Sequence, residues 1–239
     1  MTTTQNLFFS CVDSRIQDKG SMYARFHIGT FFRGQALTFA NALRRVLLSE
    51  IPGVIMTDVV IDGAGHEFAT LPGIEETVLD ILLNLKKVIF APSKLNFIEL
   101  KNFQASGLLK KSGPAKLTAA DIKLPATVRC IDKNAYIATL TSGEEFSLRF
   151  NLSIRSPQYF NNTQKTFFPE TNNRKLSFEN IPMPIQKVNY VIKSLNAKQG
   201  SEYLVLEVWT DGSIVPQEAV QFGLKNLTHL FYQFAFLSK

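Results

Sequence analysis

The sequence predicts an α+β fold in which three helices are separated by runs of short strands. Apolar residues recur with helical spacing over 37–50, over 73–87 and from Pro216 onward. Alternating or β-branched segments precede and separate these helices, and most of them lie in the middle of the chain. Apolar residues make up 45% and charged residues 19% of the 239 residues, which is the composition of a globular protein with a buried core.

The first predicted elements are a strand over 22–28 and a helix over 37–50. In the strand, Ala24, Phe26 and Ile28 alternate with more polar neighbours, as in a half-buried strand. The Pro-Gly pair at 52–53 ends the helix. The helical stripe is formed by Phe39, Leu43, Val46, Leu47 and Glu50.

Arg44 and Arg45 are adjacent on this predicted helix, so their side chains project ~100° apart. One of them can pair within the domain while the other reaches a partner. Arginine is favoured at interfaces because its planar fork binds carboxylates at two points and stacks on aromatic rings. The alternative is that both are solvated surface arginines.

A β-branched strand over 54–61 and a helix over 73–87 are predicted next. Acidic residues at 75–76 and lysines at 86–87 suit the two ends of a helix dipole. By default, this helix covers a sheet with a stripe of Ile74, Val78, Ile81, Leu82 and Leu85. The alternative is an edge that docks a partner, with a rim of Glu75, Glu76, Asp80 and Lys86.

The rest of the chain is predicted to be mostly β-structure until the final helix. Strands are expected over 97–103, 126–131, 135–140, 146–154, 188–194 and 203–210. Turns are expected at Gly107, 112–114, 132–134 and 211–213, and an irregular surface excursion over 156–174. Pro216 suits the first position of the final helix.

The final helix carries more apolar surface than a single chain needs. Its stripe comprises Ala219, Phe222, Asn226, Leu227, Leu230, Phe231 and Phe234, and Phe236 adds a further ring. A lone surface helix does not need so much apolar area, so we infer a partner, which is a second copy of this chain. The alternative is that both faces of the helix pack intramolecularly.

The residues argue against a stand-alone enzyme and against a metal site. The chain has no serine-hydrolase, zinc-protease, phosphate-loop or dinucleotide-binding motif. Asp58 and Asp62 have no third carboxylate nearby in sequence, as two-metal catalysis needs. Cys11 and Cys130 are far apart and the three histidines are isolated, so we expect no metal, no cofactor and a reducing compartment.

The net charge of +6 and the pI near 9.3 leave two interpretations. One is a nucleic-acid-binding protein, whose binding would weaken with salt, and the other is a mildly basic solvated surface. The basic residues are scattered, and the densest pairs are those at 86–87 and 110–111. No apolar run reaches the ~20 residues that span a bilayer, and no secretory signal is present, so we expect no membrane association.

Several motifs, taken in order, resemble one known family. They lie at 41–48, 51–53, 61–63, 66–68, 72–76, 84–86, 112–114, 118–122, 184–191 and 206–214. In this order and spacing, the chain from about Tyr23 to its end resembles the N-terminal assembly domain of the alpha subunit of RNA polymerase, of the bacterial and plastid kind.

This resemblance implies a non-catalytic subunit of a DNA-directed RNA polymerase, a nucleotidyltransferase complex. It implies a dimerisation domain built from 1–50 and 180–239, and an inserted, mostly β domain over 51–179. A homodimer would form through the first and last helices, at Phe39, Leu43, Val46, Leu47, Leu227, Leu230, Phe231 and Phe234. The active site would lie on other subunits, and DNA would be met only through the complex.

The resemblance also implies where the two large subunits bind. The positions that match the family's beta-binding residues are Arg44, Arg45, Leu48, Ser49, Glu75 and Lys86, with Arg45 as the main one. The later strands of the inserted domain and the segment 175–206 would approach the beta-prime subunit from the other protomer.

The sequence departs from the family pattern in three places. Ala36 and Ala40 stand where glycines are expected, and 154–159 replaces a basic Gly-Arg-Gly-Tyr segment. Val215 replaces a capping aspartate, at a cost of about 1 kcal/mol. The chain ends at Lys239, so we expect the C-terminal DNA-binding domain to be absent. Abundant Phe, Lys and Asn favour a plastid-encoded protein in the chloroplast, with the bacterial cytoplasm as the alternative.

Overall fold

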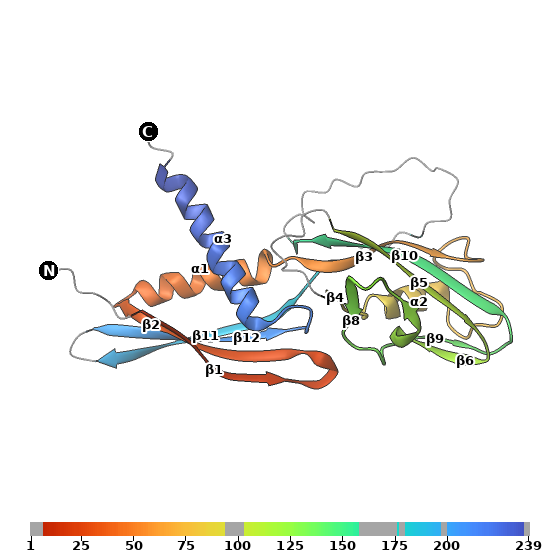
Figure 1. Cartoon of the computed structure of the whole chain (residues 1–239), viewed down its shortest axis with the longest axis horizontal. Coiled ribbons are helices and arrows are strands. Elements are labelled where there is room, and N and C mark those ends of the chain that lie inside the picture. Colours follow the sequence, from red (N-terminus) through yellow and green to blue (C-terminus); the bar gives the residue numbers. More distant parts are fainter. Residues whose placement is uncertain (1–6, 94–102, 158–175, 177–179, 197–199, 237–239) are drawn as a thin grey trace. The chain divides into compact units, whose positions relative to one another are not determined.

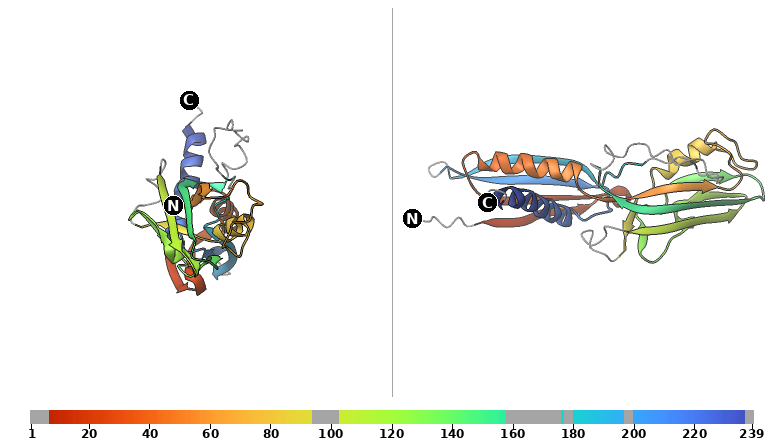
Figure 2. Two further views of the ribbon diagram at one scale, coloured as in Figure 1. Left: turned by 90° about the vertical axis from the view of Figure 1, so that its right-hand side faces the viewer. Right: turned by 90° about the horizontal axis from the view of Figure 1, so that it is seen from above.

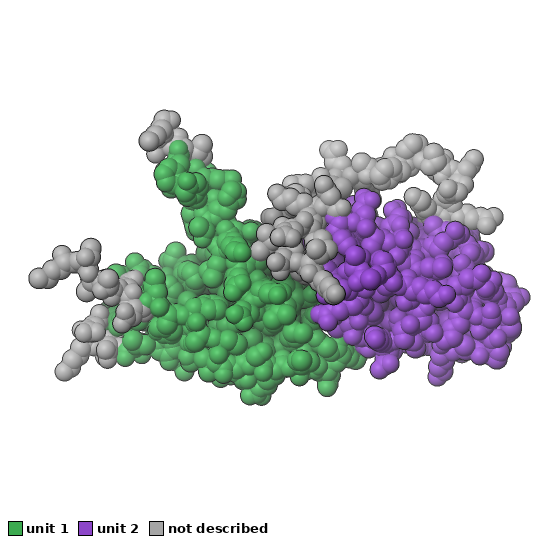
Figure 3. Space-filling model, in the orientation of Figure 1, with its two compact units in different colours: residues 1–51, 183–239 green, residues 52–182 purple. Residues whose placement is uncertain are grey.

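The computed structural model describes residues 7–93, 103–157, 176, 180–196 and 200–236. The chain forms two compact units, shown in Figure 3. The first unit combines Met1–Ile51 with Met183–Lys239, and the second is Pro52–Pro182. Both ends of the chain therefore belong to one unit, and the other unit is inserted between them in the sequence.

The first unit is a four-stranded antiparallel sheet with two helices on one face (Figures 1 and 2). In spatial order the strands are β1 (Phe8–Ile16), β2 (Met22–Phe32), β12 (Ser201–Thr210) and β11 (Ile185–Asn196). A 3-10 turn, η1 (Asp18–Gly20), connects the first two strands. The helices are α1 (Gln35–Ser49) and α3 (Pro216–Phe236).

The pairing of β2 with β12 joins the two ends of the chain. Phe26 lies opposite Leu206, and Ile28 lies opposite Leu204. All four side chains are buried, because alternate residues of each strand face the helices. The two distant halves of the first unit are thus held together by one continuous apolar layer.

The second unit packs a short helix and small sheets around its own core. Its main sheet has the order β3 (Gly53–Ile61), β10 (Glu145–Arg155), β5 (Gln104–Ser112) and β7 (Ile122–Lys123). Two further pairs are β4 (Phe90–Pro92) with β8 (Val128–Cys130), and β6 (Ala115–Thr118) with β9 (Tyr136–Leu140). Helix α2 (Val78–Leu85) and the 3-10 turn η3 (Ala119–Asp121) complete the unit.

The predicted α+β class is confirmed, as are most of the predicted elements. Seven of the predicted strands correspond to β2, β3, β8, β9, β10, β11 and β12, and the first and last predicted helices to α1 and α3. Strands β1, β4, β5, β6 and β7 were not predicted. Of the predicted strand over 97–103 only Phe103 is described, and it is not in a strand. The predicted excursion over 156–174 lies outside the described residues from 158 onward.

The helix predicted over 73–87 is wrong at its start. Helix α2 begins at Val78, because Thr77 is its N-cap and forms a capping box with Asp80, the third residue of the helix. Thr77 Oγ1 accepts from the Asp80 N–H at 3.2 Å, and an Asp80 carboxylate oxygen accepts from the Thr77 N–H at 3.2 Å.

Glu75 and Glu76 therefore precede the helix and do not occupy its first turn. Lys86 is the C-cap and Lys87 follows it, so the predicted lysines do not lie in the last turn either. The predicted placement of charges in the two terminal turns is wrong at both ends.

The turn predicted at Gly107 is wrong, because this residue lies inside β5 opposite Phe150 of β10. A β-carbon at this position would overlap the Phe150 ring. That ring is itself buried and lies beside Phe90, with ring centroids 5.8 Å apart. Glycine here makes room for an aromatic side chain that fills the core.

We expect Gly107→Ala to lower the free energy of unfolding by about 1–3 kcal/mol, because the Phe150 ring must move out of its packed position. Gly143→Ala is the matched control, since a β-carbon there would meet nothing within 4 Å. Urea denaturation of both variants measures the difference. Equal stability of the two variants would contradict the role of Gly107.

Candidate dimerisation and docking surfaces

Helix α3 is supported by its own protomer over only the first part of its length. Its buried residues are Pro216, Ala219, Val220, Gly223 and Leu227. From Thr228 to Phe236 every residue is exposed. Figure 1 shows this second part of α3 projecting away from α1 and the sheet.

Gly223 is the point of close approach between α3 and α1. A β-carbon on Gly223 would lie 3.2 Å from Leu43 Cδ1 and 3.4 Å from Leu47 Cδ2. These distances show that the two helices pack with little space between them. Leu43 and Leu47 fill the interface from the α1 side, and both are almost completely buried.

The apolar stripe of α3 continues after this support ends. Leu230 and Phe234 follow Gly223 and Leu227 along one face of the helix, and Phe231 lies beside them. The exposed fractions are 44% for Leu230, 62% for Phe231 and 67% for Phe234. A stripe that is core at one end of a helix and solvent-exposed at the other leaves an apolar surface that a partner can cover.

The structure divides the eight residues predicted for dimerisation into two groups. Leu43, Val46, Leu47 and Leu227 are buried within the protomer, at 8% exposure or less, so they offer little surface to a second chain. Leu230, Phe231 and Phe234 are exposed, and Phe39 is half-buried with its ring against Phe31 at 5.1 Å between centroids. The sequence pattern shows the stripe but does not show where the protomer's own support ends.

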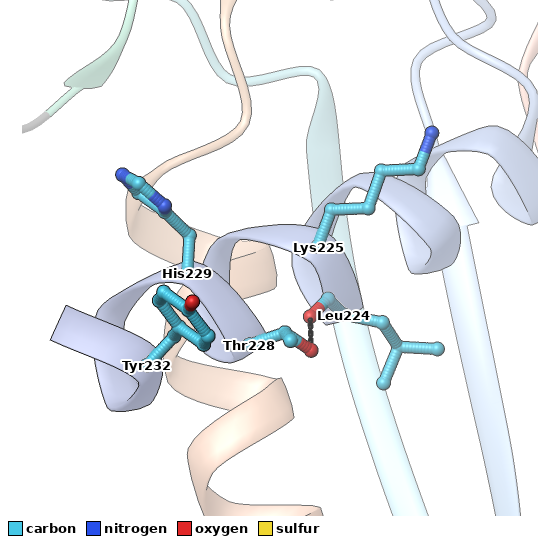
Figure 4. Close-up of a pocket in the computed structure, with 5 residues that line it drawn as sticks. All are labelled: Leu224, Lys225, Thr228, His229 and Tyr232. Carbon is cyan, nitrogen blue, oxygen red and sulfur yellow. Dashed lines mark hydrogen bonds between the residues drawn. The ribbon is translucent and has the colours of Figure 1, made fainter. Parts of the chain in front are cut away.

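A shallow groove lies on another face of α3, shown in Figure 4. It is lined by Leu224, Lys225, Thr228, His229 and Tyr232. The Tyr232 ring contacts the Phe236 ring, with centroids 4.5 Å apart. Tyr232 was not singled out in the sequence, although its place in an aromatic-rich helix end is the feature that could have identified it.

The predicted docking residues of α1 all lie at the surface. Arg44, Arg45 and Ser49 are exposed, and 42% of the Leu48 surface is accessible. The Ser49 hydroxyl donates to the Arg45 carbonyl at 2.7 Å, which ties the last turn of the helix together. Within the described residues neither guanidinium forms an ion pair, so the pairing that one arginine could have made within its own domain is not observed.

Glu75 and Lys86 belong to the second unit, and both side chains are exposed. The segment before α2 is fixed to β9, because the Glu75 N–H donates to the Thr139 carbonyl at 3.1 Å. The Glu76 carboxylate accepts from the Tyr136 hydroxyl and from the Thr139 N–H, the latter at 2.8 Å. Burial, together with the hydrogen bond to Glu76, raises the pKa of Tyr136.

Three exposed apolar residues of the second unit were not predicted as contacts. Phe68 is 69% exposed, Leu79 36% and Leu83 47%. Leu79 and Leu83 are four residues apart on the outer face of α2. The sequence could have indicated them, because α2 is apolar at six of its eight positions, which is more than one buried stripe requires.

Comparison with known proteins gives the family. The chain matches a model described as the RNA polymerase Rpb3/Rpb11 dimerisation domain over residues 30–231. It is 53% identical to the DNA-directed RNA polymerase subunit alpha of Chlorella vulgaris, over 100% of this chain and 99% of that protein.

The chain belongs to the RNA polymerase alpha-subunit family. Two further relatives carry the same name: one from Cyanidium caldarium is 38% identical over 92% of this chain and 68% of that protein, and one from Trichormus variabilis is 37% identical over the same shares. As an alpha-family member, the chain acts in transcription, as part of a transferase complex. The matched span runs from the end of β2 to Phe231, so it includes α1, the second unit and most of α3.

None of the helices within the described residues of this alpha-family chain is long and apolar enough to cross a membrane. The described residues also contain no group of three or more His, Cys, Asp or Glu side chains that could hold a metal ion.

The two cysteines are expected to react at different rates. Cys11 is exposed on β1, whereas Cys130 is partly buried in β8. Burial, together with the nearby Asp132 carboxylate, raises the pKa of the Cys130 thiol to about 11, so little of the reactive thiolate is present at pH 8. Iodoacetamide at pH 8 should modify Cys11 first, and mass spectrometry of a time course will show the order. Each cysteine can also be followed alone, Cys130 in the Cys11→Ser variant and Cys11 in the Cys130→Ser variant. Faster modification of Cys130 than of Cys11 would contradict the expected order.

Proposed function

We propose that the chain forms a homodimer that serves as the assembly platform for the beta and beta-prime subunits of RNA polymerase. The observation that carries this proposal is the exposed continuation of the α3 stripe beyond Leu227. The family match agrees with it, because the matching model is described as a dimerisation domain. We expect the paired interfaces to exceed ~2,000 Å² in total, as obligate interfaces do.

In this proposal the first compact unit is the dimerisation domain and the second is an inserted docking domain. The active site lies on the large subunits, and the chain meets DNA only through the complex. Two identical protomers offer two copies of one surface, and each of the two large subunits uses one copy. The mechanism is therefore positional and needs no reacting group on this chain.

We propose that Arg45 is the main contact for the beta subunit, with Arg44, Leu48 and Ser49 around it. The exposed position of the guanidinium on helix α1 supports this, because arginine anchors interfaces through two-point bonds to carboxylates. We further propose that Glu75 and Lys86 take part from the second unit, with Leu79, Leu83 and Phe68 as apolar contacts.

Arg45→Ala is expected to weaken binding of the beta subunit by about 2 kcal/mol, or roughly 30-fold, while the dimer stays intact. The side chain forms no ion pair within the described residues, so its loss should not lower stability. Pull-down of beta with graded amounts of the variant measures the change. Lys123→Ala removes an exposed cation from β7 and is the control. Capture of beta by Arg45→Ala at wild-type strength would refute the assignment.

We propose a plastid location, supported by the relatives from Chlorella vulgaris and Cyanidium caldarium. The relative from Trichormus variabilis keeps the bacterial cytoplasm as the alternative. Cell fractionation with an antibody against the chain would decide between the two.

A further inference from the structure

A hydrogen bond between α3 and α1 lies where the support of α3 ends. The Asn226 side-chain amide donates to a Glu50 carboxylate oxygen at 3.2 Å. Both residues are half-buried, and Glu50 caps the C-terminus of α1. Asn226 stands among apolar residues of the α3 stripe, between Gly223 and Leu227, which are both buried.

Beyond Asn226 and Leu227, the side-chain hydrogen bonds and ring contacts of α3 within the described residues stay inside the helix. Thr228 donates to the Leu224 carbonyl, Gln233 contacts His229, and the Tyr232 ring contacts Phe236. The bond from Asn226 to Glu50 is therefore the last hydrogen bond that holds α3 to α1 before the exposed tip begins. The direction of the tip depends on the packing at Gly223 and on this bond.

A polar pair in an apolar helix contact is costly to leave unsatisfied, so it restricts the ways in which two helices can pack. An apolar residue at position 226 would tolerate a shift of α3 along α1, whereas asparagine has one position in which its amide meets Glu50. Single asparagines specify register in this way in other helix interfaces.

We propose that Asn226, through its bond to Glu50, is a positioning residue that sets the crossing of α3 over α1 and thereby selects one dimer geometry. This inference rests on the proposed dimer. It concerns the joint inside each protomer, whereas the dimer contacts themselves belong to Leu230, Phe231 and Phe234 at the exposed tip.

The test exchanges donor and acceptor. Glu50→Gln keeps the bond, because the carbonyl of the new side-chain amide accepts from Asn226, and should leave the dimer dissociation constant within about twofold of wild type. Asn226→Asp places two carboxylates in contact and should weaken the dimer by at least about tenfold. The double variant Glu50→Gln/Asn226→Asp restores a bond of reversed direction and should recover most of the affinity.

Gln221→Glu is the matched control, because it adds the same charge to the exposed face of α3, away from Glu50. Analytical ultracentrifugation gives the dissociation constants, and thermal unfolding shows that each variant is folded. The inference is overturned if Asn226→Asp dimerises as tightly as Gln221→Glu, or if the double variant is as weak as Asn226→Asp. A monomeric wild-type chain would overturn the proposed dimer itself.

Asn226→Leu tests the same inference without a buried charge. We expect it to fold at least as stably as wild type but to lose the single dimer geometry. A spin label on the exposed Cys11, in a Cys130→Ala background, reports the distance between the two protomers. Wild type should give one narrow distance distribution and Asn226→Leu a broad or multiple one. Identical narrow distributions would overturn the role of Asn226 as a positioning residue.

Discussion

Replacing Phe231 and Phe234 together by glutamate is expected to convert the dimer to a monomer, with association weakened on the order of 1,000-fold, or about 4 kcal/mol. Both rings lie on the α3 stripe past the last buried residue, with 62% and 67% of their surface exposed in the protomer. In a dimer of this double variant, each protomer would bury two carboxylates in an apolar contact. Burying a charge that has no ion-pair or hydrogen-bond partner is costly.

The protomer itself should remain folded, because more than half of each side chain is already in water. Sedimentation over a range of protein concentrations measures the dissociation constant, and thermal unfolding at high dilution measures the protomer. Gln217→Glu/Gln221→Glu adds the same charge to exposed positions of α3 and should still dimerise. If the Phe231→Glu/Phe234→Glu variant sedimented as a dimer at wild-type concentrations, the exposed tip of α3 would not be the dimer contact.

The helices and strands that the sequence predicts are those with one side buried in the core and the other side more exposed. Strand β12 alternates between the core and the other face, and α1 has a single stripe, so period alone indicates both. Strand β1 has no such pattern, because eight of its nine residues are exposed. It is a strand because β2 pairs with its backbone, and the residues of β1 themselves do not encode that pairing.

The errors at Gly107 and at the start of α2 have the same origin, which is contact between residues distant in sequence. Gly107 is required by the Phe150 ring across the sheet, and the residues before α2 are held by Thr139 of β9. In both places the local sequence favours one structure and a tertiary contact selects another. Only the capping pair Thr77 and Asp80 was available in the sequence as a correction.

The surfaces were predictable in composition but not in extent. The apolar excess of α3 was visible in the sequence, and Arg44 and Arg45 could be placed on a helix flank. Which leucines are buried inside the protomer depends on where α3 crosses α1, and the two helices approach each other closely at Gly223. No periodicity marks one glycine in a helix as the point of contact.

Leu43→Ala is expected to lower the free energy of unfolding by about 2–5 kcal/mol, because it leaves a cavity where α1 meets α3. Leu43 is 0% exposed, and it packs against the α3 face that Gly223 opens. Leu230→Ala is the comparison, since Leu230 is 44% exposed and its truncation should weaken the dimer by about 1–2 kcal/mol with little effect on the protomer.

Thermal unfolding at several protein concentrations distinguishes the effects of the two variants, Leu43→Ala and Leu230→Ala. Dimerisation stabilises the folded chain only at concentrations where the dimer is populated. The difference in melting temperature between wild type and Leu230→Ala should therefore shrink as dilution converts the wild type into monomers. The loss for Leu43→Ala should persist at every concentration, because the cavity lies inside each protomer. If the deficit of Leu43→Ala disappeared on dilution, Leu43 would act between protomers, and the division of the α3 stripe into a buried half and a dimerising half would be incorrect.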